Sequence, residues 1–544
     1  MEDLSSSFYA RGKISNERPQ NLLEKPISRR QLLRGALAGG VLLTGGGMLS
    51  ACGGNDSGGV GTGSIRNGGT LRVGATGGGP SDSIDAHVLV SDPDIARAFQ
   101  LYEPLAIRNT DYKLEMVVAE SIEPEARPDV WTVRLKPDIT FHDGKRVTAD
   151  DVLFSLQRIV DPDNPKTGAA SISYIDIKRS KKLDERTVRV QLQIPNVNFP
   201  DDVGQYFNGI VPKDYDPKQP VGTGPFKFES FEPGQQSAFS KFPDYWREGQ
   251  PHVDELKIID FPDDTARVNA LLGGQVEAIT NLPTSQIASI KQTGQLRPLI
   301  ANTGNWQPFT MRVDQAPFND ERVGQAMRLI VDRQQMIEQA LVGYGRVAND
   351  LYSPYDICYA GDEFEQRQQD LEQARSLLRQ AGQSDLRVQL ITSPVYQGIV
   401  EAAQVFAEQA KGAGVAVNVR KVDTGTFYGN SYLNWTFAQD FWFTRTYLGQ
   451  VSQGSMPDSP FNETHWEDPE FLKLIQEARA ELNDDKRCEL LQEAQRIEYE
   501  RGGYIVWSFS DQIDAHSVEV AGFESSKTGM PLGNYGFRRV GNVA

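Results

Sequence analysis

The richest concentration of binding chemistry lies in one sixteen-residue stretch, NWTFAQDFWFTRTYLG, at residues 434–449. It combines six aromatic side chains with one acid and one base, a composition typical of a small-ligand pocket. Its candidate ligand contacts are Asp440, Trp442, Arg445 and Tyr447. The guanidinium of Arg445 favours a carboxylate or phosphate, which it can bind through two parallel hydrogen bonds. The alternative is that the aromatic residues form core and that Arg445 pairs with an acid.

A second candidate is the glycine-containing loop ATGGGPSDSIDAH at residues 75–87, which follows a predicted strand. Ligands of α/β lobes lie beyond the carboxyl ends of the strands. Gly78 and Gly79 would allow the backbone to approach a solute closely. The alternative is a surface loop that contacts no ligand.

Signatures of catalysis are missing from the chain. It contains no GxSxG, HExxH or CxxC motif, and its five histidines are scattered. The sequence therefore predicts no catalytic residue, no metal site and no cofactor. A membrane-anchored hydrolase is kept only as a less favoured alternative.

An apolar stretch near the start indicates an export signal. Residues 35–49 contain six glycines and are too short for a spanning helix of about 20 residues. Arg29 and Arg30 precede this stretch, as in a twin-arginine signal. Leu49-Ser50-Ala51-Cys52 resembles a lipoprotein lipobox. We therefore expect a signal peptide over residues 1–51 and a lipid on Cys52.

The remaining chain is predicted to be an acidic body of two or three domains on a flexible tether. We assign the tether to residues 52–69, since eight of residues 53–69 are glycine. The 493 residues from Cys52 onward exceed what one core usually organises. They carry 49 basic and 69 acidic residues, a net charge of −20 that argues against a nucleic-acid partner. No spacing demands that Cys358 and Cys488 pair, and we expect two separate thiols.

Hydrophobic periodicity predicts strand–helix–strand units, which form parallel sheets. One unit combines strands at 253–261 and 275–279 with a helix at 263–272. A second combines alternating strands at 386–391 and 415–419 with a helix at 397–411. Short alternating strands between 111 and 220 indicate a separate α+β region. Long helices are predicted at four places: 320–341, 366–381, 469–482 and 485–500.

Four segments in order resemble the family-5 extracellular solute-binding proteins, the oligopeptide, dipeptide and nickel receptors of ABC importers. The segments are WTVRLKPDITFHDGKRVTADDVLFSLQRI (131–159), GTGPFKFESF (222–231), FPDYWREGQPHVDELKIIDFPDDTARVNALLGGQVEAI (242–279) and VGQAMRLIVDRQQMIEQAL (323–341). The resemblance covers roughly residues 68–510. It implies a two-lobed α/β clamshell of type II with an extra α+β domain on the first lobe. The implied division is lobe 1 at 70–110, the extra domain at 111–221, lobe 1 again at 222–302, lobe 2 at 303–504, and a last lobe 1 segment at 505–544.

The resemblance also implies further site residues. Asn305 and Trp306 lie in TGNWQPFTMRV (303–313), near the expected passage between the lobes. Trp466 belongs to FNETHW (461–466), which resembles a pocket-rim segment of some members. Peptide-binding members use an aspartate of the 434–449 region to grip the ligand's amino group. Here Arg445 stands where an acid often follows, which favours a ligand with an anionic group.

The function implied by the resemblance is solute capture without chemistry. A peptide, opine or similar small solute would be enclosed between the lobes and delivered to a permease driven by ATPase subunits. The protein would act as a monomer on the outer face of the cell membrane, held by its lipid. The main alternative that the sequence leaves open is a sensory receptor that feeds a signalling partner.

Overall fold

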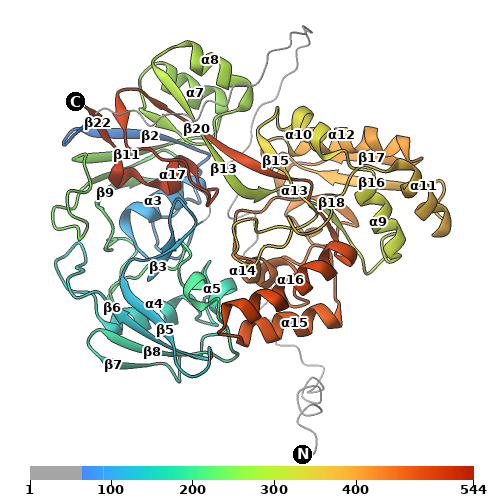
Figure 1. The fold of residues 1–544 in the computed structure, drawn as a ribbon. Coiled ribbons are helices and arrows are strands. Elements are labelled where there is room, and N and C mark those ends of the chain that lie inside the picture. Colours follow the sequence, from blue (N-terminus) through green and yellow to red (C-terminus); the bar gives the residue numbers. More distant parts are fainter. Residues whose placement is uncertain (1–63, 90) are drawn as a thin grey trace, which may run out of the picture.

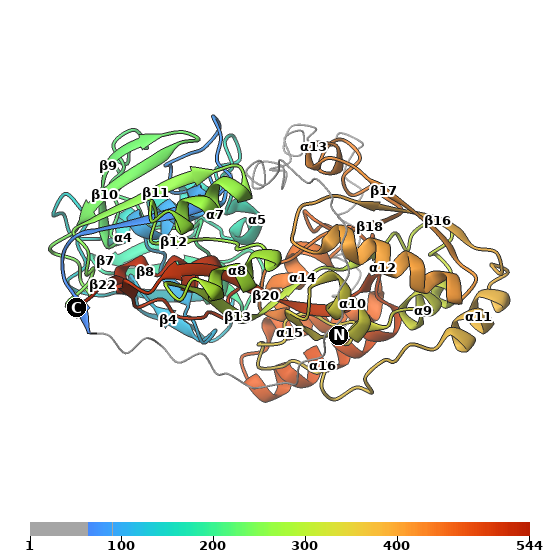
Figure 2. The same cartoon turned by 90° about the horizontal axis from the view of Figure 1, so that it is seen from above.

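The computed structural model describes residues 64–89 and 91–544, which form two lobes (Figure 1). Each lobe is built on its own β-sheet, and the two stand side by side in the view from above (Figure 2). We use lobe 1 for the part on the eight-stranded sheet and lobe 2 for the part on the five-stranded sheet. The predicted two-lobed α/β architecture is confirmed. Cys52, the arginine pair and most of the predicted tether lie outside the described residues.

The sheet of lobe 1 mixes parallel and antiparallel pairs. Both β11 and β12 pair in parallel with β2, so the predicted unit at 253–279 is confirmed. Its strands are β2 (Thr70–Thr76), β9 (Phe226–Glu232), β10 (Gln236–Lys241), β11 (Glu255–Phe261), β12 (Ala278–Ile279), β13 (Leu296–Trp306), β15 (Gly345–Val347) and β20 (Ser508–Ser517). The helices of this lobe include α3 (Asp92–Leu101), α7 (Asp264–Leu272), α8 (Ile287–Gln292) and α17 (Pro531–Tyr535).

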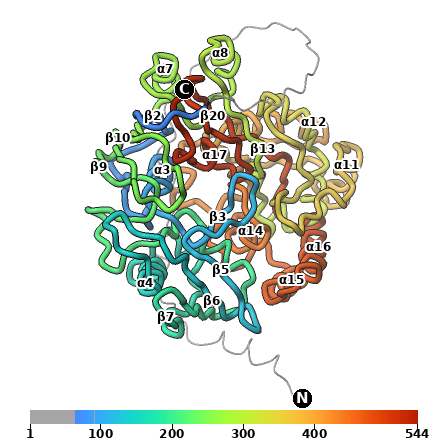
Figure 3. The backbone as a smooth tube through the Cα atoms, turned by 60° about the vertical axis from the view of Figure 1, so that its left-hand side comes forward, coloured from blue at the N-terminus to red at the C-terminus, as the bar shows by residue number. Residues whose placement is uncertain are grey.

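The C-terminal end of the chain returns to lobe 1, beside the first strands. In Figure 3 the red C-terminal segments lie next to the blue β2. A small sheet joins β1 (Ile65–Arg66), β22 (Gly541–Val543) and β21 (Val520–Ala521). The last residues are therefore built into the same lobe as the first described ones.

An α+β region extends lobe 1 below its main sheet (Figure 1). Its four-stranded antiparallel sheet has a core of its own, which includes Trp131, Val133 and Leu156. The elements are β3 (Ala106–Arg108), β4 (Leu114–Met116), β5 (Ala119–Pro124), β6 (Val130–Leu135), β7 (Lys181–Asp184), β8 (Thr187–Gln191), α4 (Ala149–Ile159), α5 (Ala169–Ile172) and α6 (Phe199–Asp202). Helix α4 begins with a capping box formed by Thr148 and Asp151.

Close backbone packing explains the glycines of GTGPF. A Cβ on Gly222 would lie 1.9 Å from the carbonyl oxygen of Leu101, and one on Gly224 would lie 2.2 Å from that of Gln100. Only glycine fits where this segment crosses the end of α3. These two glycines therefore have a structural role.

Lobe 2 contains the second parallel unit, β16–α12–β17, as predicted. Its sheet comprises β14 (Phe309–Met311), β16 (Arg387–Thr392), β17 (Ala416–Lys421), β18 (Phe437–Gln439) and β19 (Tyr504–Ile505). The helices are α9 (Glu321–Leu329), α10 (Arg333–Ala340), α11 (Leu371–Gln380), α12 (Ile399–Gly412), α13 (Thr424–Phe427), α14 (Tyr447–Gly454), α15 (Pro469–Ala480) and α16 (Asp484–Arg501).

Two observed helices differ from the predicted ones because an aspartate caps each of them. The predicted helix at 320–341 is in fact two helices, because Asp332 caps α10 by accepting a 2.9 Å hydrogen bond from the N–H of Gln335. The predicted helix at 366–381 begins only at Leu371, because Asp370 caps α11 in the same way through Gln373.

Two neighbouring strands connect the lobes. Strand β13 runs from lobe 1 toward lobe 2, and β20 runs back beside it in antiparallel register, from Leu296 opposite Ser517 to Trp306 opposite Phe509. The register shifts between Asn302 and Asn305, where β13 leaves lobe 1. Both strands cross between the lobes in Figure 1. This pair is the connection about which the lobes can move relative to each other.

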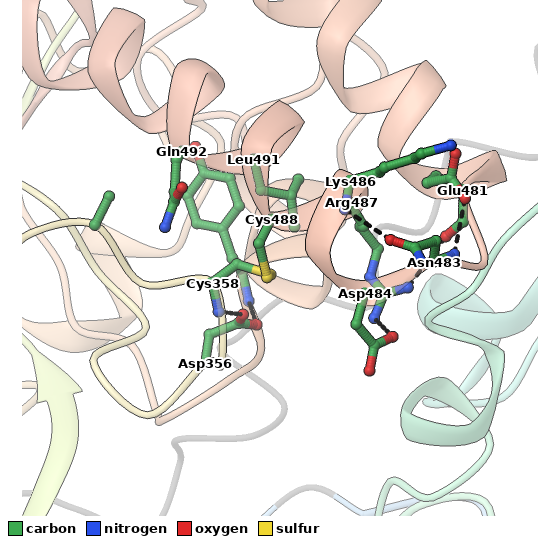
Figure 4. The surroundings of a disulfide bond; sticks show 12 residues. Asp356, Cys358, Glu481, Asn483, Asp484, Lys486, Arg487, Cys488, Leu491 and Gln492 are labelled. Atoms are coloured by element: carbon green, nitrogen blue, oxygen red, sulfur yellow. Dashed lines mark hydrogen bonds and ion pairs between the residues drawn. A yellow bond between two sulfur atoms is a disulfide. The ribbon is translucent and has the colours of Figure 1, made fainter.

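The prediction of two separate thiols was wrong. Cys358 and Cys488 form a disulfide, with their Cα atoms 4.7 Å apart (Figure 4). The two residues are 130 positions apart in sequence. Only tertiary packing brings the loop that carries Cys358 against α16, so sequence spacing held no signal for the pair.

Candidate ligand-binding site

A cavity of about 1490 Å³ lies between the lobes. Lobe 1 lines it with Thr76, Phe99 and Asn281, among others, and lobe 2 with Tyr396, Phe443 and Arg445. This volume exceeds the roughly 300–1,000 Å³ of pockets for drug-sized ligands. Aromatic side chains from both lobes contribute to the walls, together with acidic and basic groups. The cavity is thus able to enclose a solute of several linked units.

The lobes contact each other directly along the edge of the cavity. The N–H of Val197 donates to the carbonyl of Arg479 at 2.9 Å, and the hydroxyl of Thr446 donates to Asn198 at 2.9 Å. The amide of Gln453 donates to the carbonyl of Ala170 at 3.3 Å. These bonds join residues on opposite sides of the cavity, so the structure has a closed arrangement.

The predicted stretch 434–449 forms part of the lobe 2 wall. Some of its side chains line the cavity and others are buried behind the wall. Phe441, Phe443 and Arg445 line the cavity. Trp442 is 1 % exposed and is not among the lining residues. Alternation along an extended chain accounts for residues 441–443 but not beyond them, since Thr444 and Thr446 line the cavity as well. Of the two main candidates in this stretch, the structure places Arg445 at the cavity and Trp442 beneath the wall.

Trp306 and Trp442 together support this wall from below. Their backbones form a two-bond antiparallel bridge, with N–H to oxygen distances of 2.9 and 3.0 Å. Their rings are stacked, with centroids 6.1 Å apart. The guanidinium of Arg445 lies 5.4 Å from the centre of the Trp442 ring, on which it can rest as a cation on an aromatic face.

Asn305 and Asp440 are buried and position lining residues through hydrogen bonds. The Asn305 side chain accepts from the N–H of Thr444 at 2.9 Å and donates to the Tyr396 hydroxyl at 3.1 Å. Asp440 accepts from the hydroxyls of Tyr428 at 2.6 Å and Tyr432 at 3.1 Å. Thr444 and all three tyrosines line the cavity, whereas Asn305 and Asp440 do not.

The remaining predicted ligand residues lie away from the cavity lining. Trp466 packs on Phe471, with ring centroids 4.6 Å apart. Tyr447 is fully buried and donates to Glu498 at 2.8 Å. Gly78 has a φ of +102°, and a Cβ there would lie 2.6 Å from the Cβ of Asp260. At Gly79 a Cβ would meet no atom within 4 Å.

The loop that contains Gly78 and Gly79 is held by a buried ionic cluster. Arg97 donates to Asp94 at 2.8 Å and to Asp260 at 2.6 Å, and it pairs with Asp82 at 3.3 Å. All four side chains are almost completely buried. Such a network is costly to break, because removing one partner leaves an uncompensated buried charge. The loop at 75–87 is therefore held in one conformation by this cluster in lobe 1. Thr76, at its start, lines the cavity.

Sequence reasoning missed the contribution of the α+β region. Asn196, Asn198 and Asp202 line the cavity, and Tyr174 donates to Asp202 at 2.6 Å. Burial raises the pKa of Asp202 to about 7, although the surrounding donors oppose this rise. The available signal was the cluster of amides and acids in NVNFPDD (196–202).

The cavity walls carry more acids than bases. Arg108 is neutralised by Asp201, which it contacts through two hydrogen bonds of 2.6 and 2.8 Å. Burial lowers the pKa of Arg479, which lies on the lobe 2 side. The charged lining residues are Asp92, Arg108, Asp201, Asp202, Asp264, Glu401, Lys421, Arg445, Asp458, Arg479 and Asp511.

Neither a metal centre nor a spanning helix is found in the part of the chain that the structure describes. Within residues 64–89 and 91–544, no group of three or more His, Cys, Asp or Glu side chains is placed to hold a metal ion. Over the same residues, no helix has the length and apolar character needed to cross a bilayer.

Two lobes closed over a large mixed cavity, with two strands between them, define a solute-binding protein of the clamshell class. The family model for bacterial extracellular solute-binding proteins, family 5, matches residues 113–462. The chain therefore belongs to this family, whose members are substrate-binding proteins rather than enzymes.

One relative in sequence and two solved structures are similar to the chain. The chain is 26 % identical to Di/tripeptide-binding protein 2 of Pseudomonas aeruginosa, covering 78 % of this chain and 85 % of the relative. The ABC transporter substrate-binding protein CtaP of Listeria monocytogenes superposes with a TM-score of 0.77 at 20 % identity, over 88 % of this chain and 100 % of that one. The oligopeptide-binding protein AppA of Bacillus subtilis, in complex with a nonapeptide, gives a TM-score of 0.73 at 20 % identity, over 88 % and 100 %.

The contact of Tyr447 with Glu498 leads to a prediction for pH dependence. Burial raises the pKa of Glu498 from 4.5 to about 7, despite donors that include Tyr447 and Tyr352 and the nearby charge of Arg328. The folded state therefore favours the protonated acid. The contribution of Glu498 to the free energy of unfolding is fully present below about pH 4.5. It is lost as the pH rises through about 7.

We expect the free energy of unfolding of the wild type, relative to Glu498→Gln, to fall by up to about 3 kcal/mol between pH 5 and pH 8. Urea denaturation at both pH values measures this difference. Glu493→Gln is the matched control, because Glu493 is on the same helix but pairs with Arg496 at the surface. Parallel pH profiles of wild type and Glu498→Gln would contradict the prediction.

Proposed function

We propose that this chain is the receptor of an ABC importer, which captures a peptide or a chemically similar solute between its lobes and delivers it to the membrane permease. The observation that carries the proposal is the closed cavity of about 1490 Å³, with walls from both lobes. The names of the relatives support it: one binds di- and tripeptides, one is a substrate-binding protein of an ABC transporter, and one holds a nonapeptide.

Solute capture depends on closure of the two lobes. A solute that touches both walls makes contacts that exist only in the closed arrangement, so it shifts the equilibrium toward closure. The Thr446–Asn198 and Val197–Arg479 hydrogen bonds form across the same gap and add to the closed state. Making a minor closed state dominant requires several kcal/mol of differential affinity. Charge-assisted hydrogen bonds and aromatic contacts to the solute can provide this energy.

Arg445 is the residue that we assign to an anionic group of the solute. It lies on the lobe 2 wall, and its guanidinium can form two parallel bonds with a carboxylate. Next to it, the N–H and C=O of Phe443 form no hydrogen bond with any other described residue. A peptide backbone could therefore pair with this edge, while its carboxylate reaches Arg445.

We further propose that the protein is exported by the twin-arginine route and anchored through a lipid on Cys52. The order of Arg29 and Arg30, a short glycine-rich apolar stretch and a lipobox supports this part of the proposal. Because Ile65 and Arg66 pair with β22 in lobe 1, the predicted tether of 52–69 would end before β1, and it would then hold the lobes near the permease on the outer face of the membrane. Transport and sensing share this anchor, and the ABC relatives favour transport.

Arg445→Ala should weaken peptide binding about tenfold or more, because a charge-assisted hydrogen bond contributes roughly 1.5–3 kcal/mol. Calorimetric titration with a defined tri- to pentapeptide library measures the affinity. Arg420→Ala is the control, since Arg420 is exposed on β17 and does not line the cavity. An unchanged affinity in Arg445→Ala would remove Arg445 from the site, and no binding of any library member by the wild type would remove the peptide assignment.

Cys52→Ala should release the protein from the membrane, because the lipid would have no attachment point. Fractionation of cells, with palmitate labelling of the wild type, tests this expectation. Replacing Arg29 and Arg30 by lysine should instead block export and leave the precursor inside the cell. Membrane retention of an unlabelled Cys52→Ala protein would contradict the anchor.

A further inference from the structure

The loop at residues 353–360 lies between the helical layer of lobe 2 and the contact of the two lobes. Cys358 joins it to α16 through the disulfide with Cys488 (Figure 4). At its other side, the ring of Tyr355 meets Tyr112 of lobe 1, with centroids 5.9 Å apart. Tyr112 is itself one of the cavity-lining residues.

Asp356 connects this loop to the cavity wall. One of its carboxylate oxygens accepts the N–H of Cys358 at 2.9 Å. The other accepts the N–H of Tyr447, the first residue of α14, at 2.8 Å. A carboxylate is favoured at this end of a helix because the unpaired N–H groups there carry partial positive charge. One side chain therefore ties the disulfide-linked loop to the start of α14.

The start of α14 carries residues that line the cavity and contact the opposite lobe. Arg445, Thr446 and Gly449 line the cavity. Thr446 caps the helix and donates across the cleft to Asn198. A displacement of the Tyr447 backbone would therefore move the wall and the contact between lobes together.

We propose that Asp356 is a positioning residue for solute binding, and that the Cys358–Cys488 disulfide holds it in place. The disulfide fixes the loop against α16, the loop orients the carboxylate, and the carboxylate sets the position of Arg445 and Thr446. This inference rests on the proposed solute-binding function. It assigns the disulfide a role at the binding site that is additional to its effect on stability.

Hydrogen–deuterium exchange tests the positioning directly and needs no ligand. Asn at position 356 keeps the shape of Asp but can accept with only one oxygen, so it cannot hold both N–H groups. In Asp356→Asn, we expect exchange of the 445–454 segment to become roughly tenfold faster or more. Cys488→Ser should also make exchange of this segment faster. Asp370→Asn is the matched control, because Asp370 caps α11 by accepting from Gln373 at 2.8 Å and does not line the cavity.

The same variants are then titrated with the tri- to pentapeptide library. Asp356→Asn and Cys488→Ser should bind about fivefold or more weakly, whereas Asp370→Asn should bind like the wild type. Unchanged exchange at 445–454 in both variants would overturn the positioning role. Faster exchange with unchanged peptide affinity would overturn its link to binding. If exchange is faster in the two variants but the wild type itself binds no peptide, the positioning role is supported and the proposed function is contradicted.

Discussion

The pairing of β13 with β20 is the constraint on which the rest of the structure depends. These antiparallel strands connect two lobes that each have their own sheet and core. Such a two-stranded connection can serve as a hinge between the lobes. The cavity walls are thereby kept opposite each other, with Phe99 and Asn281 on one side and Tyr396 and Arg445 on the other.

Buried polar groups make each lobe rigid enough for such a motion. Arg97 fixes the corner after β2 with three carboxylates, and Asn305 and Asp440 hold the lobe 2 wall from beneath. Their loss would leave unpaired polar groups in the core, which costs more than the bonds gain. The free energy of solute binding can therefore act on the hinge and on the residues that meet across the cleft.

The sequence predicted the parallel units well, because apolar alternation in β16 and β17 and glycine after α7 and α12 are local signals. It also singled out a stretch of lobe 2 that includes lining residues of the cavity. It could not place Trp442 beneath the wall and Arg445 on it, because the long-range bridge with Trp306 sets that orientation. The disulfide and the contribution of Asn198 were missed for the same reason, since both depend on contacts between distant segments.

Small-angle X-ray scattering of the protein, with and without a peptide that binds in calorimetry, tests solute-driven closure most directly. We expect a smaller radius of gyration with the peptide and a profile that matches the closed lobes, with the peptide recovered intact. Superimposable profiles under saturating peptide, or a peptide recovered in cleaved form, would contradict it.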